Sequence, residues 1–136
     1  MARYLVVAHQ TAESRELRQA VREIAELDSA AVFTLLVPAT PPGHLLTWTD
    51  GQAATVARET GDRARSRWEA DGLQVDDVLV GDANPVYAVG DAFNSGSWDR
   101  VLVSTLPAGI SRWLKQDVVH RLERESRVPV THVVAG

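Results

Sequence analysis

The sequence predicts a doubly wound α/β domain, in which a five-stranded parallel sheet carries helices on both faces. Three observations predict it: five short apolar runs, helical patterns between them, and a chain of 136 residues of which 45% are hydrophobic. Continuous apolar runs are typical of strands buried on both faces, and strands that alternate with helices form parallel sheets through right-handed crossovers. We expect one domain over residues 1–136 with a sizeable core.

The first part of the chain predicts a β-α-β unit. A strand is expected at Tyr4–Ala8 and a second at Ala31–Val37, which is rich in β-branched and aromatic residues. The helix between them ends at Asp28 and Ser29. Its apolar stripe has helical spacing and consists of Leu17, Ala20, Val21, Ile24 and Leu27.

A long loop, Pro38 to Asp50, follows the second strand and holds three prolines. Long loops in compact domains are often functional. Its apolar residues Leu45, Leu46 and Trp48 either fold back as a lid on a ligand crevice or fill a gap beside the next helix. The second role is the commoner one for apolar loop residues.

The middle of the chain predicts a helix, a strand and another helix. The helix at Gly51–Asp71 ends at the Asp-Gly pair, and the strand follows at Val75–Val80. Asn84 is the expected amino-terminal cap of the next helix, which starts at Pro85 and ends near Gly96.

The last part predicts strand, loop, helix, strand. Val101–Val103 leads into the loop Ser104–Gly109, and the closing strand is Val128–Val134. The helix is predicted from apolar residues at every fourth position, which are Ile110, Leu114, Val118 and Leu122. In an open parallel sheet, anionic or nucleotide ligands bind in the crevice beyond the carboxyl ends of the strands, so the loop after Val103 decides the functional question.

Composition excludes several classes of function. Cysteine is absent, which excludes a disulfide framework, a thiolate metal site and a cysteine nucleophile. The net charge is -4, and the arginines are spread among acids, which argues against a nucleic-acid partner. No apolar run approaches a membrane span, and none at the start is long enough for a signal peptide. We expect a cytoplasmic protein without a membrane partner.

In the order and spacing of these elements the chain resembles the universal stress protein family. The residues that carry the resemblance are Tyr4–Ala8, the turn Asp71–Val75, the Gly81-Asp82 loop and the ending Arg127–Val134. The resemblance covers essentially the whole chain. It implies a Rossmann-like sheet with strand order 3-2-1-4-5, four helices, and a homodimer formed through the last strand.

The family's ATP motif is broken in this chain. The motif has Gly, two residues, Gly, nine residues, Gly, then Ser or Thr, and here Gly109 is the one glycine of the loop. Leu106 stands at the first glycine, and the final pair falls on Val119-His120 or on Gln116-Asp117. Leu106 adds a bulky side chain and Pro107 lacks an N–H donor, so tight ATP binding is not expected.

The candidate ligand site is expected at the carboxyl ends of the strands and the start of the last helix. Ser104, Thr105, Ser111 and the Gly109 amide are donors, and Arg112 attracts an anion. A small anion or an adenosine without phosphates would suit this set, while ATP and AMP stay open. Its full membership is Ala8, His9, Gln10, Val37, Ser104, Thr105, Gly109, Ser111, Arg112 and Asp117. Purely structural roles, with Ser111 as a helix cap and Arg112 solvated, are an equal alternative.

The function expected from these observations is a regulatory stress-response domain without enzymatic activity, which acts by small-ligand sensing or protein association. The alternatives are a nucleotide-binding protein for ATP or AMP, or a small-molecule enzyme in which His9 is the acid or base. No cofactor is expected. Nucleotidyl transferases carry His-x-Gly-His after the first strand, and this chain has His9-Gln10-Thr11-Ala12. Ser104 lacks a nucleophile elbow, and His120 with Glu123 lacks a third metal ligand.

The last strand is the expected interaction surface. It lies at an edge of the sheet and exposes unpaired backbone groups. The predicted homodimer interface consists of Val128, Val130, Thr131, His132 and Val134. Pro129 removes one donor from this edge, so an edge covered by the chain terminus or blunted by the proline is the alternative.

Overall fold

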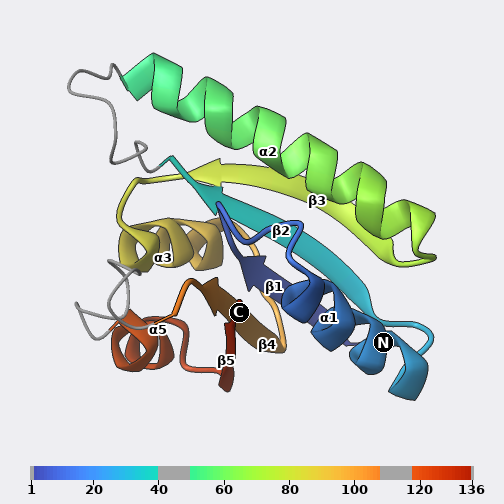
Figure 1. The fold of residues 1–136 in the computed structure, drawn as a ribbon. Coiled ribbons are helices and arrows are strands. Elements are labelled where there is room, and N and C mark those ends of the chain that lie inside the picture. Colours follow the sequence, from blue (N-terminus) through green and yellow to red (C-terminus); the bar gives the residue numbers. More distant parts are fainter. Residues whose placement is uncertain (1, 40–49, 108–117, 136) are drawn as a thin grey trace.

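A computed structural model describes residues 2–39, 50–107 and 118–135 and has the predicted sheet architecture (Figure 1). Five parallel strands pair in the order β3-β2-β1-β4-β5. In chain order the elements are β1 Arg3–Val7, α1 Arg15–Leu27, β2 Val32–Pro38, α2 Asp50–Ala70, β3 Gln74–Gly81, α3 Pro85–Ser95, β4 Arg100–Thr105, α5 Val118–Ser126 and β5 Val130–Val134. The fold class and strand order expected from the sequence are confirmed.

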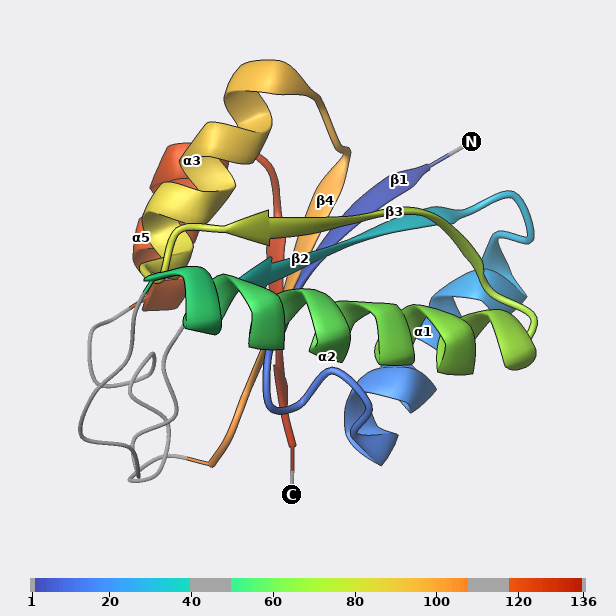
Figure 2. The same cartoon turned by 90° about the horizontal axis from the view of Figure 1, so that it is seen from above.

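The helices cover both faces of the sheet (Figure 2). On one face, Leu17 of α1 and Trp68 of α2 are fully buried against strand residues such as Phe33. On the other face, Val89 of α3 and Leu122 of α5 are fully buried against Val103. The sheet is therefore sandwiched between two apolar layers, which is the doubly wound arrangement.

The helix ends follow the local sequence signals. Asn84 caps α3, because its side chain accepts a hydrogen bond from the Val86 N–H at 2.9 Å, and Pro85 is the first helical residue. The Asp82 carboxylate accepts from the Asn84 N–H at 2.8 Å, a bond within the turn that precedes α3. Gly72 follows α2 with a φ of 88°, the left-handed conformation that favours glycine. Ser14 caps α1, because its hydroxyl accepts a hydrogen bond from the Leu17 N–H at 3.2 Å.

Element boundaries differ from the expected ones in β4 and at the end of the chain. Ser104 and Thr105 were expected in the loop, but they are the last two residues of β4. The closing strand was expected at 128–134, but β5 begins at Val130, two residues after Val128. The predicted fourth helix is described from Val118 onward as α5, where Val118 and Leu122 are buried as expected. Its predicted first half, with Ile110 and Leu114, lies outside the described residues. The loop with Leu45, Leu46 and Trp48 also lies outside them.

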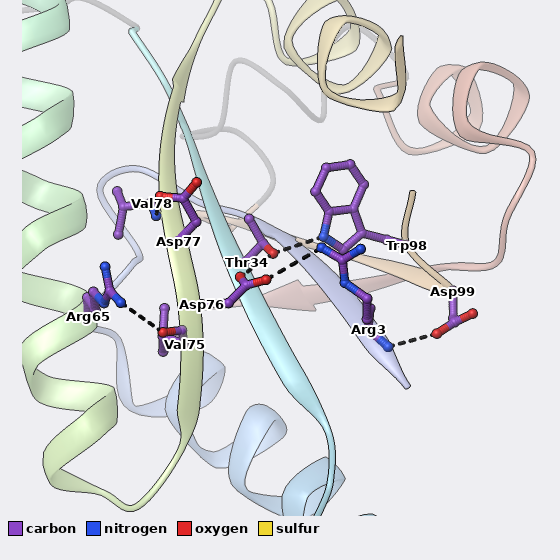
Figure 3. A network of polar contacts seen from close by, with 9 residues as sticks. All are labelled: Arg3, Thr34, Arg65, Val75, Asp76, Asp77, Val78, Trp98 and Asp99. Atoms are coloured by element: carbon purple, nitrogen blue, oxygen red, sulfur yellow. Dashed lines mark hydrogen bonds and ion pairs between the residues drawn. The ribbon is translucent and has the colours of Figure 1, made fainter. Parts of the chain in front are cut away.

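A polar network joins β1, β2 and β3 near the amino-terminal ends of these strands (Figure 3). The register between β2 and β3 shifts between Phe33 and Thr34, so that Asp76 is an extra residue in β3. The Thr34 hydroxyl accepts a hydrogen bond from the Trp98 indole N–H at 2.9 Å and donates to the Asp76 carboxylate at 2.6 Å. The Arg3 guanidinium lies 5.4 Å from the centre of the Trp98 ring and 3.4 Å from the same carboxylate. The bulge thus places a carboxylate where it satisfies a buried hydroxyl.

None of the described helices is both long enough and apolar enough to cross a membrane.

Replacing Thr34 by Val is expected to destabilise the protein by about 1–3 kcal/mol, because the buried Trp98 N–H loses its acceptor while the volume of the side chain is kept. Urea unfolding at neutral pH measures this difference. The control is Thr55→Val, which removes an exposed hydroxyl on α2 and is expected to change the free energy of unfolding by less than about 0.5 kcal/mol. Equal effects of the two changes would contradict the role given to the Thr34 hydroxyl.

Candidate functional site

The strand order creates one place where neighbouring strands send their chains to opposite faces. β1 lies between β2 and β4, and its chain continues into α1 on one face, while β4 continues toward α5 on the other. Such a switch point leaves a crevice beyond the carboxyl ends of the two strands. Val7 of β1 pairs with Val103 of β4. The residues that follow these two valines therefore lie together along one side of the crevice, which we call the border.

On the α1 side of this border, two hydroxyls bond to each other. Leu102 packs in the cluster under α1 and α2, and alternation along β4 turns Ser104 to the same side. The Ser104 hydroxyl lies 2.6 Å from that of Thr11, which follows β1, and both residues are buried. This bond joins the loop after β1 to the end of β4. Ser104 was predicted as a site residue, whereas Thr11 was missed, although a threonine in the turn after the first strand was a readable signal.

On the opposite side, Thr105 bonds to a histidine of β5. Its hydroxyl lies 2.6 Å from the His132 Nε2, and its carbonyl accepts from the Ala135 N–H at 2.8 Å. The imidazole is part-buried, and burial lowers the pKa of His132 from its ordinary value. A neutral ring can accept the hydroxyl proton at Nε2. The structure therefore joins a predicted ligand residue, Thr105, to a predicted interface residue, His132.

The polar atoms of His9 have no partner among the described residues. Both ring nitrogens are shielded from solvent, and no residue in the described ranges hydrogen-bonds to either. Burial lowers the pKa of His9, so the ring is neutral at physiological pH and holds one donor and one acceptor. Buried polar groups in native proteins almost always have a partner, and an exception points to a functional group or a binding partner. His9 is thus the most distinctive chemical group of the crevice.

The other predicted ligand residues occupy different surroundings. Ala8 is buried and donates its N–H to the Leu36 carbonyl at 3.1 Å, while Gln10 is exposed. Val37 is fully buried in the cluster under α1 and α2, so its side chain belongs to the core. Gly109, Ser111, Arg112 and Asp117 lie outside the described residues.

Beyond β4 the chain offers side chains that do not suit a phosphate loop. Leu106 and Pro107 are half-buried, and proline supplies no N–H donor for an anion. Among the residues that the structure describes, no group of three or more His, Asp or Glu residues could hold a metal ion. The described polar groups of the crevice are therefore the Thr11–Ser104 pair, the Thr105–His132 pair and the neutral His9 imidazole, which has no described partner.

The structure divides the predicted interface residues between the core and the surface. β5 is an edge strand, as expected. Val128 and Val130 pack against the cluster under α3 and α5, so they cannot form the apolar face expected for a partner. Thr131 and Val134 are exposed, the latter by 44%.

Comparisons with known proteins support the fold. No family model matches the chain, and no curated protein matches it by sequence. Among solved structures, a universal stress protein from Archaeoglobus fulgidus superposes with a TM-score of 0.64 at 17% identity, over 98% of this chain and 93% of that one. The Archaeoglobus fulgidus protein in complex with dAMP gives a TM-score of 0.62 at 20% identity, over 98% of this chain and 97% of that one.

A plant structure extends the likeness. An Arabidopsis thaliana universal stress protein family protein with AMP bound has a TM-score of 0.64 at 10% identity, over all of this chain and 93% of that one. At these identities the likeness concerns the fold. The chain has the universal stress protein fold, as its resemblance implied.

The lowered pKa of His9 predicts a loss of stability in mild acid. Below the ordinary histidine pKa of about 6.5, the unfolded chain takes up a proton that the buried ring resists, so the free energy of unfolding falls as the pH decreases from about 7.5 to about 5.5. His132 acts in the same direction. Urea unfolding of the wild type and of His9→Gln at both pH values measures the effect. The variant is expected to lose less stability over this range, and an equal loss would contradict the burial of the neutral ring.

Proposed function

We propose that the protein is a divergent universal stress protein, a non-enzymatic domain that senses a small adenosine-like ligand in the crevice beyond β1 and β4. The single observation that carries this proposal is the His9 imidazole, which is shielded from solvent and has no described partner. It follows β1 directly, next to the switch point where doubly wound sheets bind their ligands. Because adenosine compounds are made and held inside the cell, the proposal takes the protein to be cytoplasmic.

An adenosine-like ligand suits the chemistry of this residue. A neutral imidazole offers one donor and one acceptor, and a purine ring with its ribose offers both kinds of group in return. The solved structures with the same fold include complexes with dAMP, cAMP and AMP. We therefore test adenosine compounds as ligands of this chain.

The loop after β4 argues against tight ATP binding. Phosphate loops use glycines so that backbone N–H groups can approach the oxygens, and this chain has Leu106 and Pro107 there instead. The paired glycine and serine of the ATP motif are absent in either register of the sequence. A ligand with no phosphate or one phosphate requires fewer of these donors than ATP does.

Binding is favoured over catalysis by the state of the hydroxyls. Ser104 bonds to the Thr11 hydroxyl, which is not a base. Thr105 bonds to the His132 ring, a pairing that can activate a hydroxyl, but both Ser104 and Thr105 are buried and so are shielded from a substrate. An enzymatic alternative would use the neutral ring of His9 as a general base. It requires a turnover that His9→Ala abolishes, whereas the sensing proposal requires a loss of binding with no turnover in the wild type.

Calorimetric titration with adenosine, AMP and ATP tests the ligand. We expect adenosine or AMP to bind and ATP with magnesium to bind at least about tenfold more weakly. His9→Phe keeps a ring but removes both nitrogens, and we expect it to weaken the binding by about tenfold or more.

The control for this titration is Leu27→Phe, which places the same ring at an exposed position at the end of α1 and is expected to leave the affinity unchanged. Micromolar or tighter ATP binding would reject the weak-phosphate part of the proposal. If none of the three compounds binds the wild type, the sensing role itself is rejected.

We also propose a homodimer through the outer edge of β5. The Pro129 carbonyl accepts from the Val101 N–H at 3.0 Å, and the Ala135 N–H donates to the Thr105 carbonyl at 2.8 Å, so odd-numbered residues turn their backbone groups to β4. The backbone N–H and C=O groups of the even-numbered residues then point away from β4 and outward. These residues are Val130, His132 and Val134. An antiparallel pair of β5 strands with its two-fold axis at His132 would use all three on both copies.

A single cysteine tests this register, since the wild-type chain has no cysteine. In the expected pair, position 132 faces its own copy at about 5.5 Å between Cα atoms, a separation that a disulfide can bridge. His132→Cys is expected to form a covalent dimer under mild oxidation, seen by non-reducing electrophoresis. Thr131→Cys is the matched control, because the same axis holds its Cα atoms more than about 7 Å apart. Equal cross-linking at both positions, or a monomeric wild type in light scattering, would contradict the interface.

A further inference from the structure

β3 is the second edge of the sheet, and its outer side is not free. The Ala39 N–H donates to the Gly81 carbonyl at 3.0 Å, so Gly81 turns toward β2, and alternation turns the backbone groups of Val78 away from the sheet. The extra residue Asp76 reverses this alternation, which brings the Val75 carbonyl to the outer side as well. An edge strand with such groups is a template for pairing with another chain.

Side chains occupy these outer groups. The Arg58 guanidinium donates to the Val78 carbonyl at 2.8 Å, and the Arg65 guanidinium donates to the Val75 carbonyl at 3.0 Å. The Asp77 carboxylate accepts from the Val78 N–H at 2.8 Å. Figure 3 shows Arg65 reaching from α2 to Val75, with Asp77 and Val78 farther along β3. Bonds that involve a charged partner are the stronger hydrogen bonds in proteins.

The spacing of the two arginines matches the strand. Arg58 and Arg65 are seven residues apart in the sequence, which is about two helical turns and about 10 Å of rise on one face of α2. Val75 and Val78 are three residues apart in β3, about 10 Å in an extended chain. The helix and the strand run in opposite directions in these contacts, because the later arginine meets the earlier valine. Two guanidinium groups therefore fit two outward carbonyls of one edge.

The two edges of the sheet differ in this respect. In the part of the chain that the structure describes, no side chain bonds to the outward backbone groups of Val130, His132 or Val134 on β5. A strand added at β5 would displace no side chain of residues 2–39, 50–107 and 118–135, whereas a strand added at β3 would have to displace Arg58, Arg65 and Asp77.

We propose that Arg58 and Arg65 of α2, together with Asp77, close the β3 edge against a second copy of the chain. The consequence for assembly rests on the proposed β5 dimer. A two-fold pair through β5 leaves a β3 edge at each end of the joined sheet, and open β3 edges would connect dimers into a growing ribbon. The closed edge stops assembly at two copies.

The test removes the two donors and measures the mass of the full chain by light scattering over a range of concentrations. In the double variant R58Q/R65Q the shorter amides no longer reach the carbonyls, and we expect its mass to grow with concentration to about twice the wild-type mass or more. Lysine keeps a cationic donor, so R58K/R65K is expected to keep the wild-type mass. R67Q removes a guanidinium from an exposed position of the same helix and is also expected to keep it.

A folded R58Q/R65Q variant that keeps the wild-type mass overturns the proposal. If circular dichroism shows that the double variant is unfolded, R65Q alone must show the increase of mass with concentration, and a constant mass of R65Q then overturns the proposal.

The closed β3 edge and the β5 dimer fail separately. A monomeric wild type whose double variant dimerises supports the closed edge and rejects the β5 dimer, while a dimeric wild type with an unchanged double variant does the reverse.

Discussion

The structure depends on the burial of the central strands between two helical layers. Val6 and Val7 of β1 are both fully buried, one against the α1 and α2 side and the other against the α3 and α5 side. A strand that is buried on both faces needs apolar side chains at consecutive positions, so its polar residues gather at its ends. Because β1 and β4 are neighbours that leave toward opposite faces, the polar residues of both converge at one border. The crevice is thus a consequence of the core.

The border of the crevice combines side chains that hydrogen-bond to each other with one side chain that has no described hydrogen-bond partner. The pairs Thr11 with Ser104 and Thr105 with His132 link three strands through short hydrogen bonds, which hold the backbone around the crevice. His9 stands apart, because its neutral ring has no described partner and burial disfavours its charge. Rigid surroundings with one group left to bond are the usual arrangement of a recognition site. A chain that has lost the glycine pattern of a phosphate loop can therefore keep a chemically specific crevice.

The edges of the sheet show how one fold controls its own association. A parallel sheet always ends in two strands with unpaired backbone groups, whatever its core contains. In this chain α2 lies along β3 and supplies guanidinium groups to its outer carbonyls, whereas no side chain of the described residues bonds to the outward backbone groups of β5. The helix that packs a face of the sheet also covers an edge. Arginine suits this double role, because its stem packs on the sheet while its head donates.

The sequence by itself determined the order of elements, the two-sided burial and the local signals at helix ends, since these depend on periodicity and on single residues such as Asn84 and Gly72. Tertiary structure decided which polar residues meet. Thr11 and Ser104 are 93 positions apart, and the α2 arginines find β3 carbonyls that a bulge turns outward, so no local pattern could pair them. It also decided that Val37 is part of the core and that Val128 and Val130 pack against it, because an apolar side chain looks the same in sequence whether a helix or a partner covers it.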